Sequence, residues 1–199
     1  MLRRRALSGL TLVELLTGIA LLAILLALAA PSFQAQIAAS QLTSASNALL
    51  GSLMQARAQA MRMGQRVTVC RSADQQQCDT QATRGWEAGW LVFIDANRTS
   101  STGDAEVSAG DTVLARSESL PPSLRVAGNR QVNQYLSFAA GGEARTLTGG
   151  TNPLGTIRVC STSAALADQR RAVEIVLSSG GRLVSRPTAS PVDANCPAP

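Results

Sequence analysis

One acidic residue stands inside the most apolar stretch of the chain. Residues 10–30, LTLVELLTGIALLAILLALAA, are apolar or small except for Thr11, Glu14 and Thr17. A charge at the centre of a membrane costs about 2.5 to 3.5 kcal/mol, so an ionisable residue in such a segment is a functional hypothesis by default. Glu14 is therefore the first residue for which we seek a partner. The alternative is a carboxylate that only extends to the membrane interface.

The four cysteines could form two disulfides. Cys70 and Cys78 are eight residues apart in CRSADQQQC, whereas Cys160 and Cys196 lie in the C-terminal third. Four cysteines permit three connectivities, and we favour Cys70–Cys78 with Cys160–Cys196 because the first pair closes a short polar loop. Four free thiols are the alternative, but an oxidising compartment such as a periplasm favours the bridges. In the entropic account, the Cys160–Cys196 bridge would contribute on the order of 3 kcal/mol.

The composition argues against most enzyme mechanisms. The 199 residues include no histidine, and all 18 basic residues are arginine. Without histidine the chain has no Ser-His-Asp triad, no Cys-His pair and no His-ligated zinc or haem. The sequence also lacks GxSxG, GxxxxGK[ST] and CxxC. We therefore predict a protein that is not an enzyme and that needs no cofactor.

The stretch DANRTSSTGDAE, residues 95–106, partly fits a calcium-binding loop. Its oxygen-bearing residues at template positions 1, 3, 5, 7 and 12 are Asp95, Asn97, Thr99, Ser101 and Glu106. Serine replaces the glycine that the template needs at position 6, and threonine replaces an acid at position 5. The prediction is a polar hairpin loop, with a weak calcium site as the alternative.

Charge is distributed unevenly along the chain. Residues 64–115 contain four arginines and seven acids, a balance of −3, whereas residues 116–199 contain nine arginines and five acids, a balance of +4. A basic C-terminal half suits contact with a phosphate backbone.

The N-terminal segment predicts a membrane anchor. A helix over residues 10–30 measures about 30 Å, which spans a bilayer. Three arginines, Arg3–Arg5, precede it and nothing strongly basic follows it directly, so the N-terminus should stay in the cytoplasm and the rest of the chain outside. A secretory signal peptide is the alternative, which the length of the apolar run and Glu14 oppose.

Helical periodicity continues beyond Pro31. Apolar residues recur at spacings of three and four up to Gly64, a natural helix stop; they are Leu42, Ala45, Leu49, Leu53, Ala56, Ala60 and Met63. We expect one helix over residues 10–63, about 80 Å long if continuous and kinked near Pro31. Residues 10–30 would lie in the membrane and residues 31–63 on a head domain. A coiled coil is the competing interpretation, but too few heptads are present to favour it.

From Arg66 onward short β-branched runs alternate with turn-rich segments, which is typical of antiparallel strands. The runs are RVTVC, GWLVFID, DTVLARS, SLRVAG, QYLSFAA, GTIRVCS, RRAVEIVLSS and GRLVSRP. Residues 64–199 are therefore predicted to form a head of seven or eight strands. The fold class is α+β, a long N-terminal helix packed on a small antiparallel sandwich or meander. Trp90 and either Trp86 or Phe93 should lie in its core.

The N-terminus resembles a type IV prepilin signal, the class III signal peptide. SGLTLVELLTGIALLAILLALAAPSF has a basic leader that ends in glycine, a hydrophobic first mature residue, a glutamate at mature position five and a proline near the helix end. The residues that match are Gly9, Thr11, Leu12, Glu14 and Pro31, and Leu10 is the hydrophobic first mature residue. The resemblance implies that residues 1–9 are a leader, that a prepilin peptidase cuts after Gly9, and that it methylates Leu10. Most of the family has phenylalanine at that position.

Cleavage would give Glu14 a partner. It creates a free amine at Leu10, and in a filament of parallel helices the Glu14 carboxylate can neutralise the amine of a neighbouring subunit. A buried ion pair adds little net stability, but loss of one partner costs about 3 to 5 kcal/mol. Such a pair therefore fixes the register of neighbouring subunits in the filament.

The head resembles the GspH/FimT family of minor pilins and pseudopilins. The matching segments are VTVCRSAD (67–74), GWEAGWLVFIDAN (85–97), YLSFAAGGEA (135–144), IRVCS (157–161) and EIVLSSGGRLV (174–184). The resemblance implies a minor subunit that primes or caps a type IV pilus or a type II secretion pseudopilus. Before assembly it would be a single-pass inner-membrane protein with a periplasmic head. Its partners would be the prepilin peptidase, the major pilin, and other minor pilins or pseudopilins.

DNA uptake in natural transformation is the alternative function. FimT-type pilins of competent bacteria resemble DNA receptors through a C-terminal Gly-Arg-x-Arg pattern, and this chain has GRLVSR at 181–186 instead. On a strand Arg182 and Arg186 would share a face, about 13 Å apart, and Arg170 and Arg171 would supplement them. No aromatic residue lies between these arginines, so binding would be nonspecific phosphate contact. Solvated surface arginines are the alternative.

Overall fold

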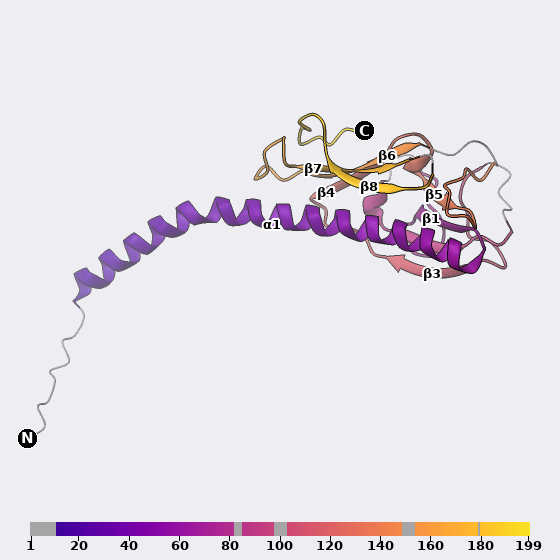
Figure 1. Cartoon of the computed structure of the whole chain (residues 1–199). Coiled ribbons are helices and arrows are strands. Elements are labelled where there is room, and N and C mark those ends of the chain that lie inside the picture. The colour runs from indigo at the N-terminus through magenta and orange to yellow at the C-terminus, as the bar shows by residue number, and fades with distance from the viewer. Residues whose placement is uncertain (1–10, 82–84, 98–102, 149–153, 179) are drawn as a thin grey trace, which may run out of the picture.

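The computed structural model describes residues 11–81, 85–97, 103–148, 154–178 and 180–199. Its longest element is helix α1 (Leu12–Met63), 52 residues that pass through Pro31 without interruption and end at Gly64, whose φ of 65° is left-handed. At about 1.5 Å per residue the helix measures roughly 78 Å. Figure 1 shows its N-terminal part bending and projecting far from the head, while its C-terminal part lies along the head.

The projecting part of α1 carries an exposed apolar surface. Its exposed large hydrophobic residues are Leu12, Val13, Leu15, Leu16, Ile19, Leu21, Leu22, Ile24, Leu25, Leu26, Phe33 and Ile37. By length and composition this helix can cross a membrane. A hydrophobic surface of this size needs lipid or other helices to cover it.

The C-terminal part of α1 packs on the head through the predicted stripe. The buried members are Leu42, Ala45, Leu49, Leu53, Ala56 and Ala60. Met63 is 38% exposed, so its assignment to the stripe is wrong: it is the last helical residue, beyond the final buried turn. The remaining stripe supplies one side of the main core.

Within the described residues eight strands form two four-stranded antiparallel sheets. Sheet A has the order β3-β2-β1-β5 and contains β1 (Val67–Arg71), β2 (Trp90–Ile94), β3 (Thr112–Ser117) and β5 (Tyr135–Phe138). Sheet B has the order β4-β6-β7-β8 and contains β4 (Leu124–Gly128), β6 (Gly155–Ser161), β7 (Ala172–Leu177) and β8 (Leu183–Pro187). Two short 3-10 helices, η1 (Trp86–Ala88) and η2 (Arg130–Asn133), complete the head. The predicted α+β class is confirmed, and each of the eight predicted runs contains a strand.

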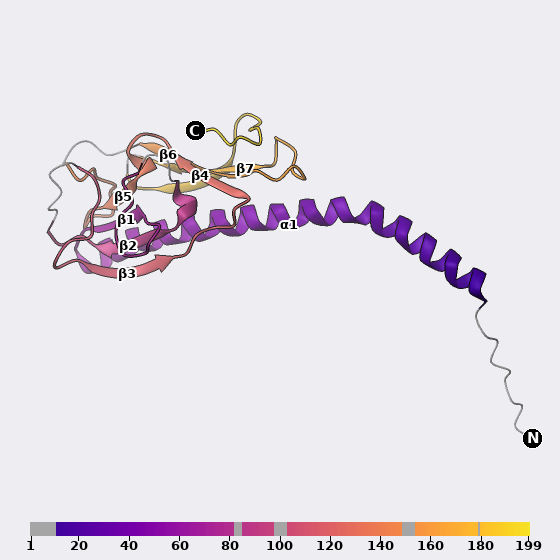
Figure 2. The same cartoon turned by 180° about the vertical axis from the view of Figure 1, so that it is seen from behind.

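One core joins both sheets to α1. The inner faces of the strands and the helix stripe meet in it, and Figure 2 shows the C-terminal part of α1 running alongside the strands of the head. Trp86 and Trp90 are buried there, and the Trp86 Nε1–H donates to the Val132 carbonyl at 3.0 Å. Phe93 is buried in a smaller cluster with Cys70 on the outer face of sheet A. The predicted aromatic core is confirmed.

Two disulfides attach peripheral segments to the outer faces of the sheets. Cys70 bonds to Cys78 and Cys160 bonds to Cys196, which is the connectivity favoured from the sequence. The second bridge holds the C-terminal tail, residues 188–199, against sheet B, where Cys160 and Cys196 cluster with Ala172 and Val192.

Candidate functional site

The first turn of α1 positions Glu14. Thr11 has extended backbone angles, φ −79° and ψ 153°, and its Oγ1 accepts a hydrogen bond from the Glu14 amide at 3.2 Å. A Thr-x-x-Glu sequence at a helix start is the capping-box pattern, and a carboxylate there is favoured by the helix dipole. Glu14 is therefore held, exposed, in the first turn of the projecting end. Gly9 and Leu10, the predicted cleavage and methylation positions, lie outside the described residues.

A second group of charged residues crosses the outer face of sheet B. Arg158 on β6, Glu174 on β7 and Arg186 on β8 are neighbours in register. The two carboxylate oxygens of Glu174 contact Arg158 Nη2 at 2.9 Å and Arg186 Nη2 at 3.3 Å. Arg158 Nη1 also donates to the carbonyl of Pro197 at 2.8 Å. One buried carboxylate thus bridges two arginines, and the C-terminal tail caps the inner one.

Three of the four arginines proposed for DNA contact are accessible. Arg182 directly precedes β8, and it shares the outward face of that edge strand with Arg186, as period-two alternation predicts. The side chain of Arg186 is 56% exposed although it pairs with Glu174. Arg170 is exposed in the β6–β7 loop, at the opposite end of β7 from Arg182. Arg182 and Arg186 therefore share the outward face of the edge strand, whereas Arg170 lies in a loop beyond the start of β7.

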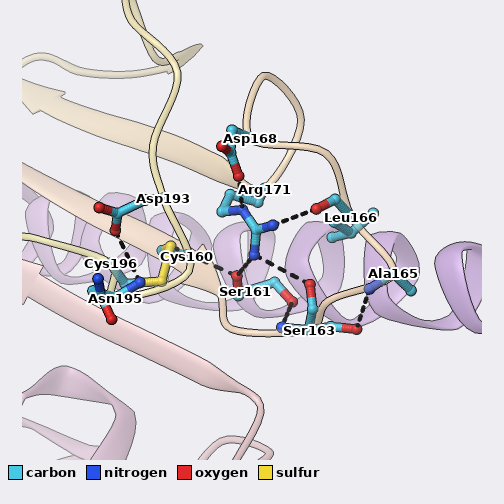
Figure 3. A network of polar contacts seen from close by, with 10 residues as sticks. All are labelled: Cys160, Ser161, Ser163, Ala165, Leu166, Asp168, Arg171, Asp193, Asn195 and Cys196. Carbon is cyan, nitrogen blue, oxygen red and sulfur yellow. Dashed lines mark hydrogen bonds and ion pairs between the residues drawn. A yellow bond between two sulfur atoms is a disulfide. The ribbon is translucent and has the colours of Figure 1, made fainter.

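Arg171 is not available for DNA, and its predicted role is wrong. The residue is 5% exposed, and its guanidinium lies inside the β6–β7 loop (Figure 3). Nε contacts Asp168 at 3.0 Å, Nη1 donates to the carbonyls of Ser161 and Ser163 at 3.0 and 3.1 Å, and Nη2 donates to the Leu166 carbonyl. The guanidinium nitrogens of Arg171 all donate to these partners, because the inward-facing carbonyl groups of the loop need hydrogen-bond donors.

The described members of the calcium template do not gather around one point. Asp95 is 8% exposed and accepts a hydrogen bond from Thr68 of sheet A at 3.2 Å, whereas the Asn97 amide donates to the Ala109 carbonyl at 2.6 Å. Glu106 is exposed. Thr99 and Ser101 lie outside the described residues. In the part of the chain that the structure describes, no group of three or more acids or cysteines is placed to hold a metal ion.

Asp111, which the template does not contain, organises this loop. Its carboxylate accepts hydrogen bonds from the Ala96 amide at 2.9 Å and from the Ser108 amide at 2.8 Å. These bonds close the segment between β2 and β3 as a polar loop.

Comparison with known proteins decides the family. The family model described as Type II transport protein GspH matches residues 45–181, more than half of the chain. The chain belongs to the GspH family. Its fold is similar to that of the type IV minor pilin FimU of Pseudomonas aeruginosa strain PAO1, with a TM-score of 0.50, 16% sequence identity, and coverage of 76% of this chain and 92% of that one. A second crystal form of FimU aligns with a TM-score of 0.45 and 18% identity, over 78% of this chain and 95% of that one.

The minor pseudopilin EpsH from the type II secretion system of Vibrio cholerae aligns with a TM-score of 0.45 and 10% identity, over 75% of this chain and 99% of that one. No curated protein sequence matches the chain significantly. The GspH family comprises pilins and pseudopilins, which are structural proteins that assemble with one another.

The sequence motifs did not predict the structural roles of three residues of this GspH-family chain. Thr11 caps α1, and the Thr-x-x-Glu spacing was the signal that could have identified it. Glu174 forms ion pairs with two arginines from neighbouring strands, which a charge count along the chain does not reveal. Arg57 on α1 contacts two turns of the head, and no local pattern predicts such a distant contact.

Proposed function

We propose that this GspH-family protein is a minor pilin or pseudopilin that primes or caps a type IV pilus or a type II secretion pseudopilus. One observation carries the proposal: the first half of a 52-residue helix exposes an apolar surface away from the head, and a single acid stands in its first turn. Lipid would cover this surface before assembly, and the helices of neighbouring subunits would cover it afterwards.

Cleavage after Gly9 completes this proposal. Before cleavage, Arg3–Arg5 hold the N-terminus on the cytoplasmic side. After it, the new amine of Leu10 lies one turn from Glu14, and the Glu14 carboxylate of one subunit can neutralise the amine of another. Methylation of the amine keeps its charge, so it leaves the ion pair available. The head would lie in the periplasm, where the two disulfides are stable.

The processing step has a direct test. The full chain is produced in cells with and without a prepilin peptidase, and its intact mass is measured. The proposal expects loss of residues 1–9 and addition of one methyl group only when the peptidase is present. The Gly9→Val variant, which blocks the cleavage site with a β-branched side chain, should stay uncut. A chain cut elsewhere, or cut equally in cells without the peptidase, would overturn this part of the proposal.

DNA binding is the second candidate function, supported by Arg182 and Arg186, which are exposed on the same face of the edge strand of sheet B, and by the exposed Arg170 in the β6–β7 loop. A gel-shift series at several salt concentrations compares the full chain in detergent with its Arg182→Ala/Arg186→Ala variant. If both arginines contact phosphates, the variant binds more weakly and the salt slope falls by about 1.4 to 1.8. Equal affinity and equal slope would remove these residues from a DNA site.

A further inference from the structure

The outer face of sheet B is covered at one end and uncovered at the other. The C-terminal tail lies over the end that holds Cys160 and Ala172, where Val192 is 5% exposed. The opposite end, next to the β7–β8 turn, has no such cover among the described residues. There Thr156, Val176 and Val184 stand side by side in register on β6, β7 and β8. We call this region the open half of sheet B.

The open half is apolar at its centre. Leu154, which directly precedes β6, is 55% exposed, and Val184 is 39% exposed. Leu154, Thr156 and Val176 line a shallow depression of about 530 Å³, together with the polar residues Asn129 and Ser178. Among the described residues of the head, the exposed large hydrophobic side chains are these two and Leu114 on β3. Val176 and Val184 are cross-strand partners and Leu154 lies two residues before Thr156, so aliphatic side chains lie on this face from the start of β6 across to β8. A contiguous group of this kind is a candidate interaction surface.

The border of the open half is basic. Arg182 and Arg186 flank Val184 on the outward side of β8. Glu174 is the acid on this face, and both of its oxygens already contact arginine: Arg158 on one side and Arg186 on the other. The surface therefore offers an aliphatic floor with excess positive charge along one side, which favours an acidic partner.

The covered half shows how a chain segment binds this face. The tail places one aliphatic side chain, Val192, against the sheet. Its Pro197 and Ala198 carbonyl oxygens accept hydrogen bonds from an outward-facing arginine, Arg158. The open half repeats this combination of an apolar floor and an outward arginine, but without an occupant in the described structure.

We propose that the open half of sheet B is the docking site for an acidic segment of a neighbouring pilin-like subunit, which inserts one aliphatic side chain between Leu154 and Val184 and gives carboxylates to Arg182 and Arg186. This proposal rests on the proposed function for the nature of the partner. DNA fits the surface less well, because a phosphate backbone gains nothing from two exposed aliphatic residues and no aromatic residue is present to stack on a base.

The test uses a fluorescent peptide of alternating glutamate and valine with one central leucine, titrated with the full chain in detergent. The proposal expects binding that falls about tenfold in Arg182→Glu and about tenfold in Val184→Ser. Leu114→Ser/Arg116→Glu on β3 is the matched control, because it changes one exposed aliphatic residue and one exposed arginine on the edge of sheet A. This control should bind as the parent chain does. Circular dichroism verifies that each variant is folded.

Two results would overturn the proposal: absence of peptide binding, or binding that both Arg182→Glu and Val184→Ser leave unchanged. Oligonucleotides of equal charge provide the third comparison. If they bind more tightly than the peptide, and if Arg182→Glu weakens them while Val184→Ser does not, the surface is a nucleic-acid site instead. None of these results depends on cleavage after Gly9, so failure here is distinguishable from failure of the proposed function.

Discussion

Two adjacent arginines in the β6–β7 loop have opposite environments. Arg170 is exposed, whereas Arg171 is 5% exposed and uses its guanidinium to hold Asp168 and three backbone carbonyls (Figure 3). The sequence presents them as an equivalent pair. The loop distinguishes them because inward-facing carbonyl groups need donors, and a buried arginine supplies several at once.

We therefore expect Arg171→Ala to lower the free energy of unfolding by about 3 kcal/mol, because it leaves the loop carbonyls without their donor. For a chain of this size that corresponds to a fall of roughly 6 to 12 °C in the thermal midpoint. Tryptophan fluorescence reports the transition, since Trp86 and Trp90 are both buried in the head. Arg170→Ala is the control and should shift the midpoint little. Equal effects of the two variants would contradict the structural role of Arg171.

Tyr135 makes one residue-scale contact sensitive to pH. Burial raises the pKa of the Tyr135 hydroxyl above its ordinary value of about 10, the hydrogen bond from the Leu147 amide lowers the pKa in part, and the charge of Asp104 raises it further. An unfolded chain loses this proton near pH 10 while the folded chain keeps it. The contribution to stability is therefore fully present below about pH 10 and is lost as the pH rises through the folded pKa.

This chain has one tyrosine, so absorbance titration of tyrosinate reports Tyr135 directly. We expect a single transition above the ordinary tyrosine pKa in the folded chain and a transition near pH 10 in denaturant. Tyr135→Phe should abolish both. A folded-state transition at or below the denatured one would show that the hydroxyl is not buried.

At the scale of elements, the docking of α1 on the head depends on long-range hydrogen bonds as well as on the apolar stripe, and those of Arg57 hold two turns. Arg57 Nε donates to the Gly142 carbonyl at 2.7 Å, and its Nη2 donates to the Gly180 carbonyl at 3.2 Å. Gly142 has a φ of +80°, and a Cβ there would lie 2.6 Å from Met61 Sδ. A turn after β5 and the β7–β8 turn are thus held against the same part of the helix.

Replacement of Arg57 by alanine should loosen both turns. We expect a loss of about 1 to 2 kcal/mol and faster amide exchange at residues 139–144 and 180–182. Arg62→Ala is the matched control, because Arg62 contacts Gln59 within α1 and is exposed. Unchanged exchange at both turns in Arg57→Ala would show that Arg57 does not hold them against the helix.

Elements with a strong hydrophobic period and the two disulfides were predictable from the sequence, whereas polar contacts between distant segments were not. Leu49 and Leu53 fall on the stripe because helical spacing dictates which residues share a face, and alternation likewise predicts the outward direction of Arg182 and Arg186. The burial of Arg171 could not be predicted, since it depends on where a loop folds back on itself. The ion pairs on the outer face of sheet B could not be predicted either. Glu174 lies between Arg158 and Arg186 in the sheet, although it is distant from Arg158 in sequence.

At the scale of the whole molecule, the head and the projecting part of α1 have different surfaces. Polar residues, two disulfides and a shared core stabilise the head, while the projecting part of α1 exposes aliphatic side chains with Glu14 in its first turn. A charged group in that position is costly to bury alone, so the assembly that we propose needs a partner charge. The open half of sheet B would add a second contact between subunits, on the head.

The incorporation of a Glu14→Ala variant into filaments tests the proposed assembly most directly. The parent chain and the variant are expressed in a strain that lacks the native copy, filaments are sheared from the cells, and both fractions are quantified against the processed protein in the membrane. We predict that Glu14→Ala is cleaved like the parent but falls at least about tenfold in the filament fraction, because the amine of a neighbouring subunit is left unpaired at a cost of roughly 3 to 5 kcal/mol. Normal incorporation of the processed variant would contradict the account.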